Sequence, residues 1–128
     1  MEKINIGMYV RTKDGIIDKI LKLNKSYVKG VSQKDELYAY DIDNIIKASY
    51  NITDLIEVGD IITFNFSNDV YKVLCVPNKK VGCEDFYFEY DISQEFEDLR
   101  MKPEMVKGQI KSIITHEQME QMAYKVGE

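Results

Sequence analysis

The pattern of a β-hairpin occurs twice in this chain of 128 residues, and the repetition constrains the fold more than any other feature. The first copy, Gly7 to Leu21, reads GMYVRTKDGIIDKIL, and the second, Val58 to Leu74, reads VGDIITFNFSNDVYKVL. In each copy apolar and polar residues alternate, turn-forming residues follow, and a second stretch rich in β-branched residues forms the other strand of the hairpin. Two equivalent antiparallel hairpins are therefore predicted.

The ends of the two copies also correspond. Asn51 and Thr115 are residue types that cap helix N-termini, and Thr115 with Gln118 has the spacing of a capping box. We expect each copy to end in a short capped helical turn, the second with Met119 and Met122 on its buried side. The matching residues are Ile46-Lys47 with Ile110-Lys111, Asn51 with Thr115, and Leu55 with Met119.

The segments between hairpin and cap supply the remaining strands. In the first copy SYVKGVS and ELYAYDI are predicted as two short strands, and in the second CEDFYFEYD places Phe86, Phe88 and Tyr90 on one face. The acidic segment ISQEFEDLRMKPEMVKG that follows is less regular, so we expect a loop with one helical turn there.

This order of elements predicts a mainly β protein of two tandem small barrels, at residues 1–57 and 58–128. Each resembles the five-stranded Src-homology-3 barrel and ends in a short capped helical turn. Closing a sheet protects edges that a lone meander leaves open. A barrel of roughly 55 residues is marginal alone, so packing two copies together gives the duplication a physical reason.

Charge is spread unevenly over the chain. Residues 1–50 hold nine Lys and Arg against seven Asp and Glu, whereas residues 51–128 hold eight against fifteen. Nucleic-acid binding needs concentrated positive charge, so the second half is a poor candidate for it. No apolar run approaches the roughly 18 residues of a membrane helix, and the start MEKINIG lacks a signal-peptide layout. We expect a cytoplasmic protein without a membrane partner.

Few residues offer reaction chemistry, so no enzyme, cofactor or metal is predicted. His116 is the single histidine, expected at the exposed start of the last helix without an evident partner. Cys75 and Cys83 flank a predicted turn and are interpreted as free thiols, with a pairing across the hairpin as the alternative. A solvated acidic face is favoured over a cation site for the acidic residues Glu84, Asp85, Glu89, Asp91, Glu95, Glu97 and Asp98.

Tyrosine is abundant, with nine residues and no tryptophan. Tyrosine packs well in strands, and it also suits interfaces because it combines rigid contact area with a polar tip. One interpretation is that the tyrosines serve only to pack the strands. The other is a binding surface on the first copy, composed of Tyr9, Arg11, Lys13, Tyr38 and Tyr40.

Two resemblances to known families bear on the function and the origin of the chain. Gly7, Val10, Gly15 and Ile17 resemble the hairpin of KOW-type barrel domains, which commonly bind RNA, ribosomes, polymerase or chromatin proteins. INIGMYVRTKDG, IIKASYNITDLIEVGD and IKSIITHEQMEQMAYKVGE are similar to short uncharacterised proteins from phages and prophages of Gram-positive, clostridia-type bacteria. This second resemblance implies a phage or prophage gene product made in the host cytoplasm.

The favoured hypothesis is a non-enzymatic protein-binding or adaptor module whose partner is a host or phage protein. The alternative is a nucleic-acid-binding, KOW-like module that acts through the first barrel, with Arg11, Lys13 and Lys19 as its basic contacts. An enzyme is the last alternative, which a deep pocket gathering His116 with acidic residues would favour and a shallow surface around His116 would exclude. An assembly role through self-association at a barrel edge also stays open, which would make the protein a homo-oligomer.

Overall fold

The computed structural model describes residues 4–23, 27–32, 37–92 and 95–122. The chain divides into two compact units, Met1–Leu55 and Ile56–Glu128, which we call unit 1 and unit 2. The expected boundary lay two residues later, after residue 57. None of the helices in the described residues has the length and apolar character needed to cross a membrane.

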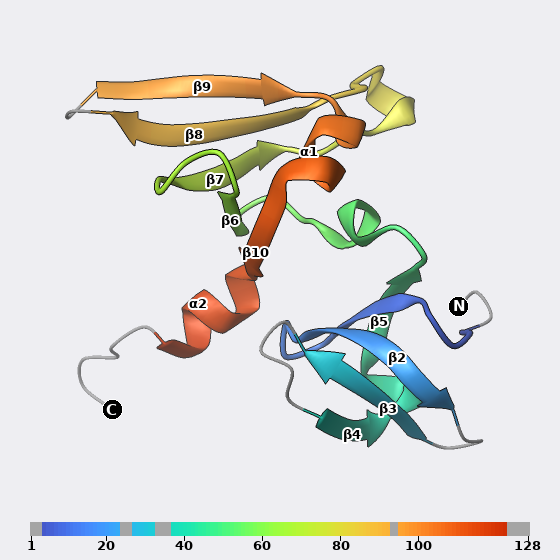
Figure 1. The fold of residues 1–128 in the computed structure, drawn as a ribbon. Coiled ribbons are helices and arrows are strands. Elements are labelled where there is room, and N and C mark those ends of the chain that lie inside the picture. Colours follow the sequence, from blue (N-terminus) through green and yellow to red (C-terminus); the bar gives the residue numbers. More distant parts are fainter. Residues whose placement is uncertain (1–3, 24–26, 33–36, 93–94, 123–128) are drawn as a thin grey trace. The chain divides into compact units, whose positions relative to one another are not determined.

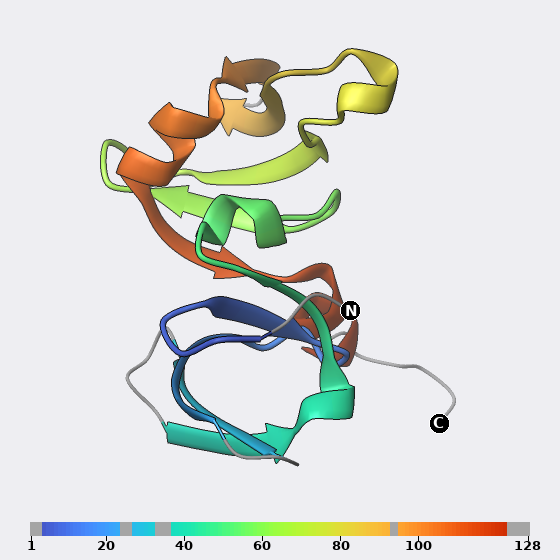
Figure 2. The ribbon, with the colours of Figure 1, turned by 90° about the vertical axis from the view of Figure 1, so that its right-hand side faces the viewer.

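Unit 1 is a five-stranded antiparallel sheet with the strand order β4-β3-β2-β1-β5 (Figure 1). A short 3₁₀ turn separates β4 from β5, and a second one follows β5. Figure 2 shows that this sheet is strongly curved. The elements are β1 (Tyr9–Thr12), β2 (Ile17–Leu23), β3 (Tyr27–Ser32), β4 (Leu37–Asp41), η1 (Ile42–Asn44), β5 (Ile45–Ser49) and η2 (Ile52–Leu55).

Unit 2 is also a five-stranded antiparallel sheet, and its order β10-β6-β7-β8-β9 is the order of unit 1. In both units the first strand therefore lies between the second strand and the fifth. The elements are β6 (Ile61–Phe64), β7 (Val70–Cys75), η3 (Lys79–Val81), β8 (Phe86–Ile92), β9 (Glu95–Met101), α1 (Pro103–Gln109), β10 (Ile110–Ile114) and α2 (His116–Met122).

The prediction of a mainly β fold is confirmed. Within the described strands neither sheet closes on itself, so the structure shows two antiparallel sheets and no closed barrel. Closure would need pairing between the two outer strands of a sheet, and the described pairings of β4 and β9 are with β3 and β8.

Each sheet buries one face in an apolar core, as the alternation along its strands predicts. In unit 1 the core contains Met8, Val10, Ile20 and Ile45. In unit 2 aromatic rings fill it: the ring centroid of Phe64 lies 5.1 Å from that of Tyr71 and 5.4 Å from that of Phe88, both edge-on. Edge-to-face packing adds to the stabilisation from area burial. Phe86 and Phe88, predicted to share one face, are both buried.

The prediction of a loop after β8 is wrong. Residues 95–101 form β9, which pairs with β8 from Phe86 opposite Met101 to Ile92 opposite Glu95. The helical turn is confirmed as α1, with Pro103 in its first turn, where the missing N–H has no helical partner. Acidic residues have low strand propensity, but a neighbouring strand that supplies hydrogen-bond partners overrides it.

The prediction for the last helix is also partly wrong. Met119, expected on the buried side of α2, has 44% of its surface exposed. The side chain of Met122 lies outside the described residues.

Both hairpins begin with the same set of backbone hydrogen bonds. The Gly7 N–H donates to the Ile20 carbonyl at 3.0 Å, and the Gly59 N–H donates to the Val73 carbonyl at 2.9 Å. The return bonds also match, from Ile20 N–H to the Met8 carbonyl at 2.8 Å and from Val73 N–H to the Asp60 carbonyl at 2.9 Å. Gly7 and Gly59 both have positive φ, at 91° and 94°, which side chains rarely adopt.

We predict that Gly59→Ala lowers the free energy of unfolding by about 1–3 kcal/mol, because the backbone at positive φ becomes strained. Gly7→Ala should lose a similar amount, since both glycines have positive φ and a Cβ at either position meets only ordinary contacts, with the His116 Cβ at 3.4 Å from Gly59 and Tyr50 Cε1 at 3.9 Å from Gly7. Urea unfolding measures both. Gly108→Ala is the control, because Gly108 lies in α1 with open space around it, and it should not destabilise. Equal stability of Gly59→Ala and the unchanged chain would contradict the prediction.

Candidate functional site

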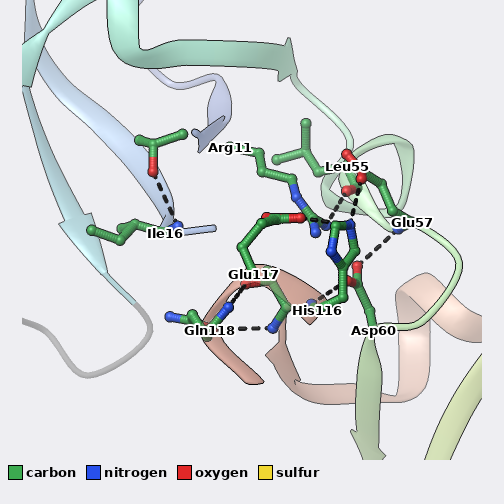
Figure 3. Close-up of polar contacts among 10 residues, drawn as sticks. Arg11, Ile16, Leu55, Glu57, Asp60, His116, Glu117 and Gln118 are labelled. Carbon is green, nitrogen blue, oxygen red and sulfur yellow. Dashed lines mark hydrogen bonds and ion pairs between the residues drawn. The ribbon is translucent and has the colours of Figure 1, made fainter. Parts of the chain in front are cut away.

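A buried carboxylate joins the start of β6 to the start of α2 in unit 2 (Figure 3). Asp60 has no exposed surface. Its Oδ2 accepts a hydrogen bond from the Glu57 backbone N–H at 2.8 Å, and its Oδ1 accepts one from the His116 backbone N–H at 2.9 Å. A buried carboxylate is tolerated only when hydrogen bonds satisfy it, so Asp60 fixes the backbone at Glu57 and at His116 together.

The side chains of Glu57, His116 and Glu117 converge at this point, and we call them the His116 cluster. The His116 Nε2 lies 2.9 Å from Glu57 Oε1 and 2.6 Å from Glu117 Oε1. The three side chains are 35%, 24% and 16% exposed for His116, Glu57 and Glu117, so solvent reaches them only in part. Nε2 carries at most one proton, so the two carboxylate oxygens compete for a single N–H donor.

Local sequence fixes the histidine at the first position of α2. The Gln118 backbone N–H donates to Thr115 Oγ1 at 3.3 Å, and the Thr115 N–H donates to Gln118 Oε1 at 3.1 Å. These reciprocal bonds confirm the predicted capping box. Gly59 lies beside this histidine, and a Cβ built on it would be 3.4 Å from the His116 Cβ.

The donor atoms of the His116 cluster lie within 4.8 Å of one another. Imidazole nitrogen with carboxylate oxygens is a donor set that divalent transition metals accept, and it is equally a set that shares and transfers a proton. Sequence reasoning missed the cluster because Glu57 and His116 are 59 residues apart. The usable signal was the corresponding pattern of hairpin and helix cap in the two halves of the chain. If the last strand of the second half pairs with its first strand, the cap that follows lies beside the start of that first strand, as β10 and β6 do here.

Unit 1 has the same backbone arrangement without these charges. There the Asn5 N–H donates to the sulfur of Met8 at 3.2 Å, where in unit 2 the Glu57 N–H donates to the carboxylate of Asp60. Met8 belongs to the apolar core of unit 1. The fold can therefore be built with a thioether at this position, where unit 2 has the buried carboxylate of Asp60.

The predicted binding residues are not all on a free surface. Lys13 is exposed, and Tyr9 is half-buried with Lys19 Nζ 5.8 Å from its ring centroid. Arg11, expected on a solvated strand face, is buried instead, and its Nη1 donates to the Leu55 carbonyl at 2.9 Å. A long side chain that finds an internal acceptor can be buried despite its charge.

The other two predicted binding residues, Tyr38 and Tyr40, lie on β4, which β2 and β3 separate from β1 within the sheet. Their side chains lie outside the described residues.

The predicted acidic face is only partly present. Glu84 is exposed, but Asp85 is buried and its Oδ2 pairs with Arg100 Nε. Glu89 is half-buried on β8. The remaining acidic side chains of that set, Asp91, Glu95, Glu97 and Asp98, lie outside the described residues.

Both cysteines are free thiols, as expected, but their sulfur atoms are only 3.4 Å apart. The pKa of the Cys75 thiol is raised above its ordinary value, first by its hydrogen bond to Cys83 and then by partial burial.

No protein-family model matches the chain, and neither a curated protein nor a solved structure shows significant similarity to it.

We predict that Asp60→Ala lowers the free energy of unfolding by about 2–4 kcal/mol, because two backbone N–H groups lose their acceptor inside the protein. Asp60→Asn keeps one carbonyl acceptor and should lose less. The matched control is Asp54→Ala, since Asp54 is exposed and accepts one hydrogen bond from Ser49 Oγ at 2.6 Å. Urea unfolding followed by circular dichroism measures all three, and an Asp60→Ala loss no larger than that of Asp54→Ala would refute the role of Asp60.

Proposed function

We propose that the chain is a non-enzymatic protein-binding or adaptor module, built from two tandem Src-homology-3-like domains and made from a phage or prophage gene in the host cytoplasm. The shared strand order and the matched hydrogen bonds at Gly7 and Gly59 support the tandem origin. The resemblance of both chain ends to phage proteins supports the setting.

The proposal of protein binding rests on the outer face of the unit 2 sheet. This face, opposite the aromatic core, presents Val70 and Leu74 on β7 and Ile114 on β10, with 58%, 39% and 37% of their surfaces exposed. Strand alternation puts these residues on the side away from the buried Tyr71 and Val73. Aliphatic side chains exposed together on a rigid sheet are a common feature of protein-binding surfaces.

The charges of the outer face favour a protein over a nucleic acid. Lys72 of β7 lies opposite Glu89 of β8 in the strand register, so charges of opposite sign stand side by side. Arg100 pairs with Asp85 and lies over the ring of Tyr87. A surface with compensated charges has little attraction for phosphates. The partner that fits is a protein with an aliphatic patch bordered by charges of both signs.

The identity of the partner class is tested by affinity capture with the tagged full chain from phage-infected or prophage-induced host lysate. One arm is treated with nuclease and one is not. A protein recovered equally in both arms agrees with the proposal. Recovery that disappears with nuclease would support the KOW-like alternative through Lys13 and Lys19 of unit 1, and neutralising these lysines would then abolish it.

We predict that the double variant Val70→Ser/Leu74→Ser lowers affinity for the captured protein by at least about tenfold, a loss typical of removing interface core residues. The control is Val81→Ser/Met105→Ser, because these side chains are 73% and 56% exposed but lie on η3 and α1 and not on a strand of the sheet. It should bind as the unchanged chain does. Isothermal titration with the purified partner measures each affinity, and equal losses from the two double variants would exclude this face.

A further inference from the structure

The two cysteines of unit 2 lie close enough to react with each other. Cys75 ends β7, Cys83 lies eight residues further along the chain, and their Sγ atoms are 3.4 Å apart. Both side chains are half-buried, so a small reagent can reach them from solvent. Unlike a lone thiol, a pair in contact can exchange with a disulfide and end as an internal bond.

The backbone holds the pair in place. Asn78 and Cys83 form an isolated antiparallel bridge in which the Asn78 N–H donates to the Cys83 carbonyl at 2.8 Å and the Cys83 N–H donates to the Asn78 carbonyl at 3.1 Å. Gly82, with φ of 72°, makes the tight return between them possible. On the other side, Cys75 lies opposite Tyr87 at a β-bulge. The contact between the sulfurs therefore follows from two fixed backbone segments.

The hydrogen bonds of the pair connect the two thiols to each other and to nearby backbone. The Cys83 thiol donates to the Asp85 carbonyl oxygen at 3.2 Å, the Cys75 thiol donates to the Val76 carbonyl oxygen at 3.6 Å, and either thiol can donate the hydrogen bond between the two sulfurs. The pKa of Cys75 is raised, first by its hydrogen bond to Cys83. Because the thiolate is the nucleophile in exchange, the reaction begins at whichever of the two sulfurs loses its proton, and the other sulfur is already in contact with it.

We propose that Cys75 and Cys83 form a reversible dithiol–disulfide site that reacts with low-molecular-weight disulfides of the glutathione class. The thiolate of one cysteine attacks one sulfur of the reagent disulfide, which forms a mixed disulfide and releases one reagent thiolate. The other cysteine then loses its proton to solvent and attacks the protein sulfur of the mixed disulfide, which releases the second reagent thiolate. The protein loses two protons and two electrons, and the reagent disulfide gains them and becomes two thiols.

The test uses the purified full chain equilibrated with mixtures of reduced and oxidised glutathione, then quenched with an alkylating reagent and analysed by mass spectrometry. We expect an internal Cys75–Cys83 disulfide in the monomer. The same equilibration in urea measures the effective concentration of the two thiols set by chain spacing alone, which is millimolar for short flexible segments. The folded chain should exceed the urea value by at least about tenfold, because the fold places the sulfurs in contact.

Two single variants identify the steps. Cys75→Ser should stop at a mixed disulfide between Cys83 and glutathione, and Cys83→Ser should stop at one between Cys75 and glutathione. Thermal unfolding of the reduced variants checks that both are folded. As an independent readout, the folding equilibrium constant of the oxidised chain should exceed that of the reduced chain by the same factor, since the two equilibria are linked.

Three results would overturn the proposal. One is an effective concentration in the folded chain no higher than in urea. The second is an unchanged chain that stops at the mixed disulfide, and the third is a disulfide that forms only between molecules.

Discussion

The antiparallel pairing of β6 with β10 is the interaction on which the site of unit 2 depends. Ile114 lies opposite Ile61 in this antiparallel pair, so Thr115, which follows Ile114, and Asp60, which precedes Ile61, are brought together. A strand pair fixes register because a slip by one residue would move its buried side chains to the wrong face. Once the register is set, the Asp60 carboxylate meets the His116 N–H without further adjustment.

The buried carboxylate then turns a strand pairing into a polar site. Burial of Asp60 is unfavourable by itself, and two backbone donors compensate for it. These bonds hold the loop before β6 and the first turn of α2 in one arrangement, so that the His116 ring stands between Glu57 and Glu117 (Figure 3). Unit 1, with Met8 at the equivalent place, shows that the same pairing forms without any charge there.

One end of the unit 2 sheet thus carries two different chemistries on one scaffold. Because β6 and β7 are antiparallel, the start of β6, beside the His116 cluster, lies at the same end of the sheet as the end of β7, where the thiol pair lies. The outer face of the same sheet presents aliphatic side chains and paired charges. Rigid strands with functional groups at their ends and loops are a common arrangement, because a packed sheet positions groups more accurately than a loop does.

The sequence by itself determined the mainly β class, the two hairpins, the buried faces of Phe86 and Phe88, and the capping box at Thr115. Each depends on short-range rules: strand alternation, glycine at positive φ, and side-chain oxygens that reach nearby backbone N–H groups. Only the tertiary structure decided that residues 95–101 form a strand, that Arg11 is buried, and that His116 meets Glu57. These depend on partners far along the chain, and local propensity carries no information about a partner that the fold has yet to bring near.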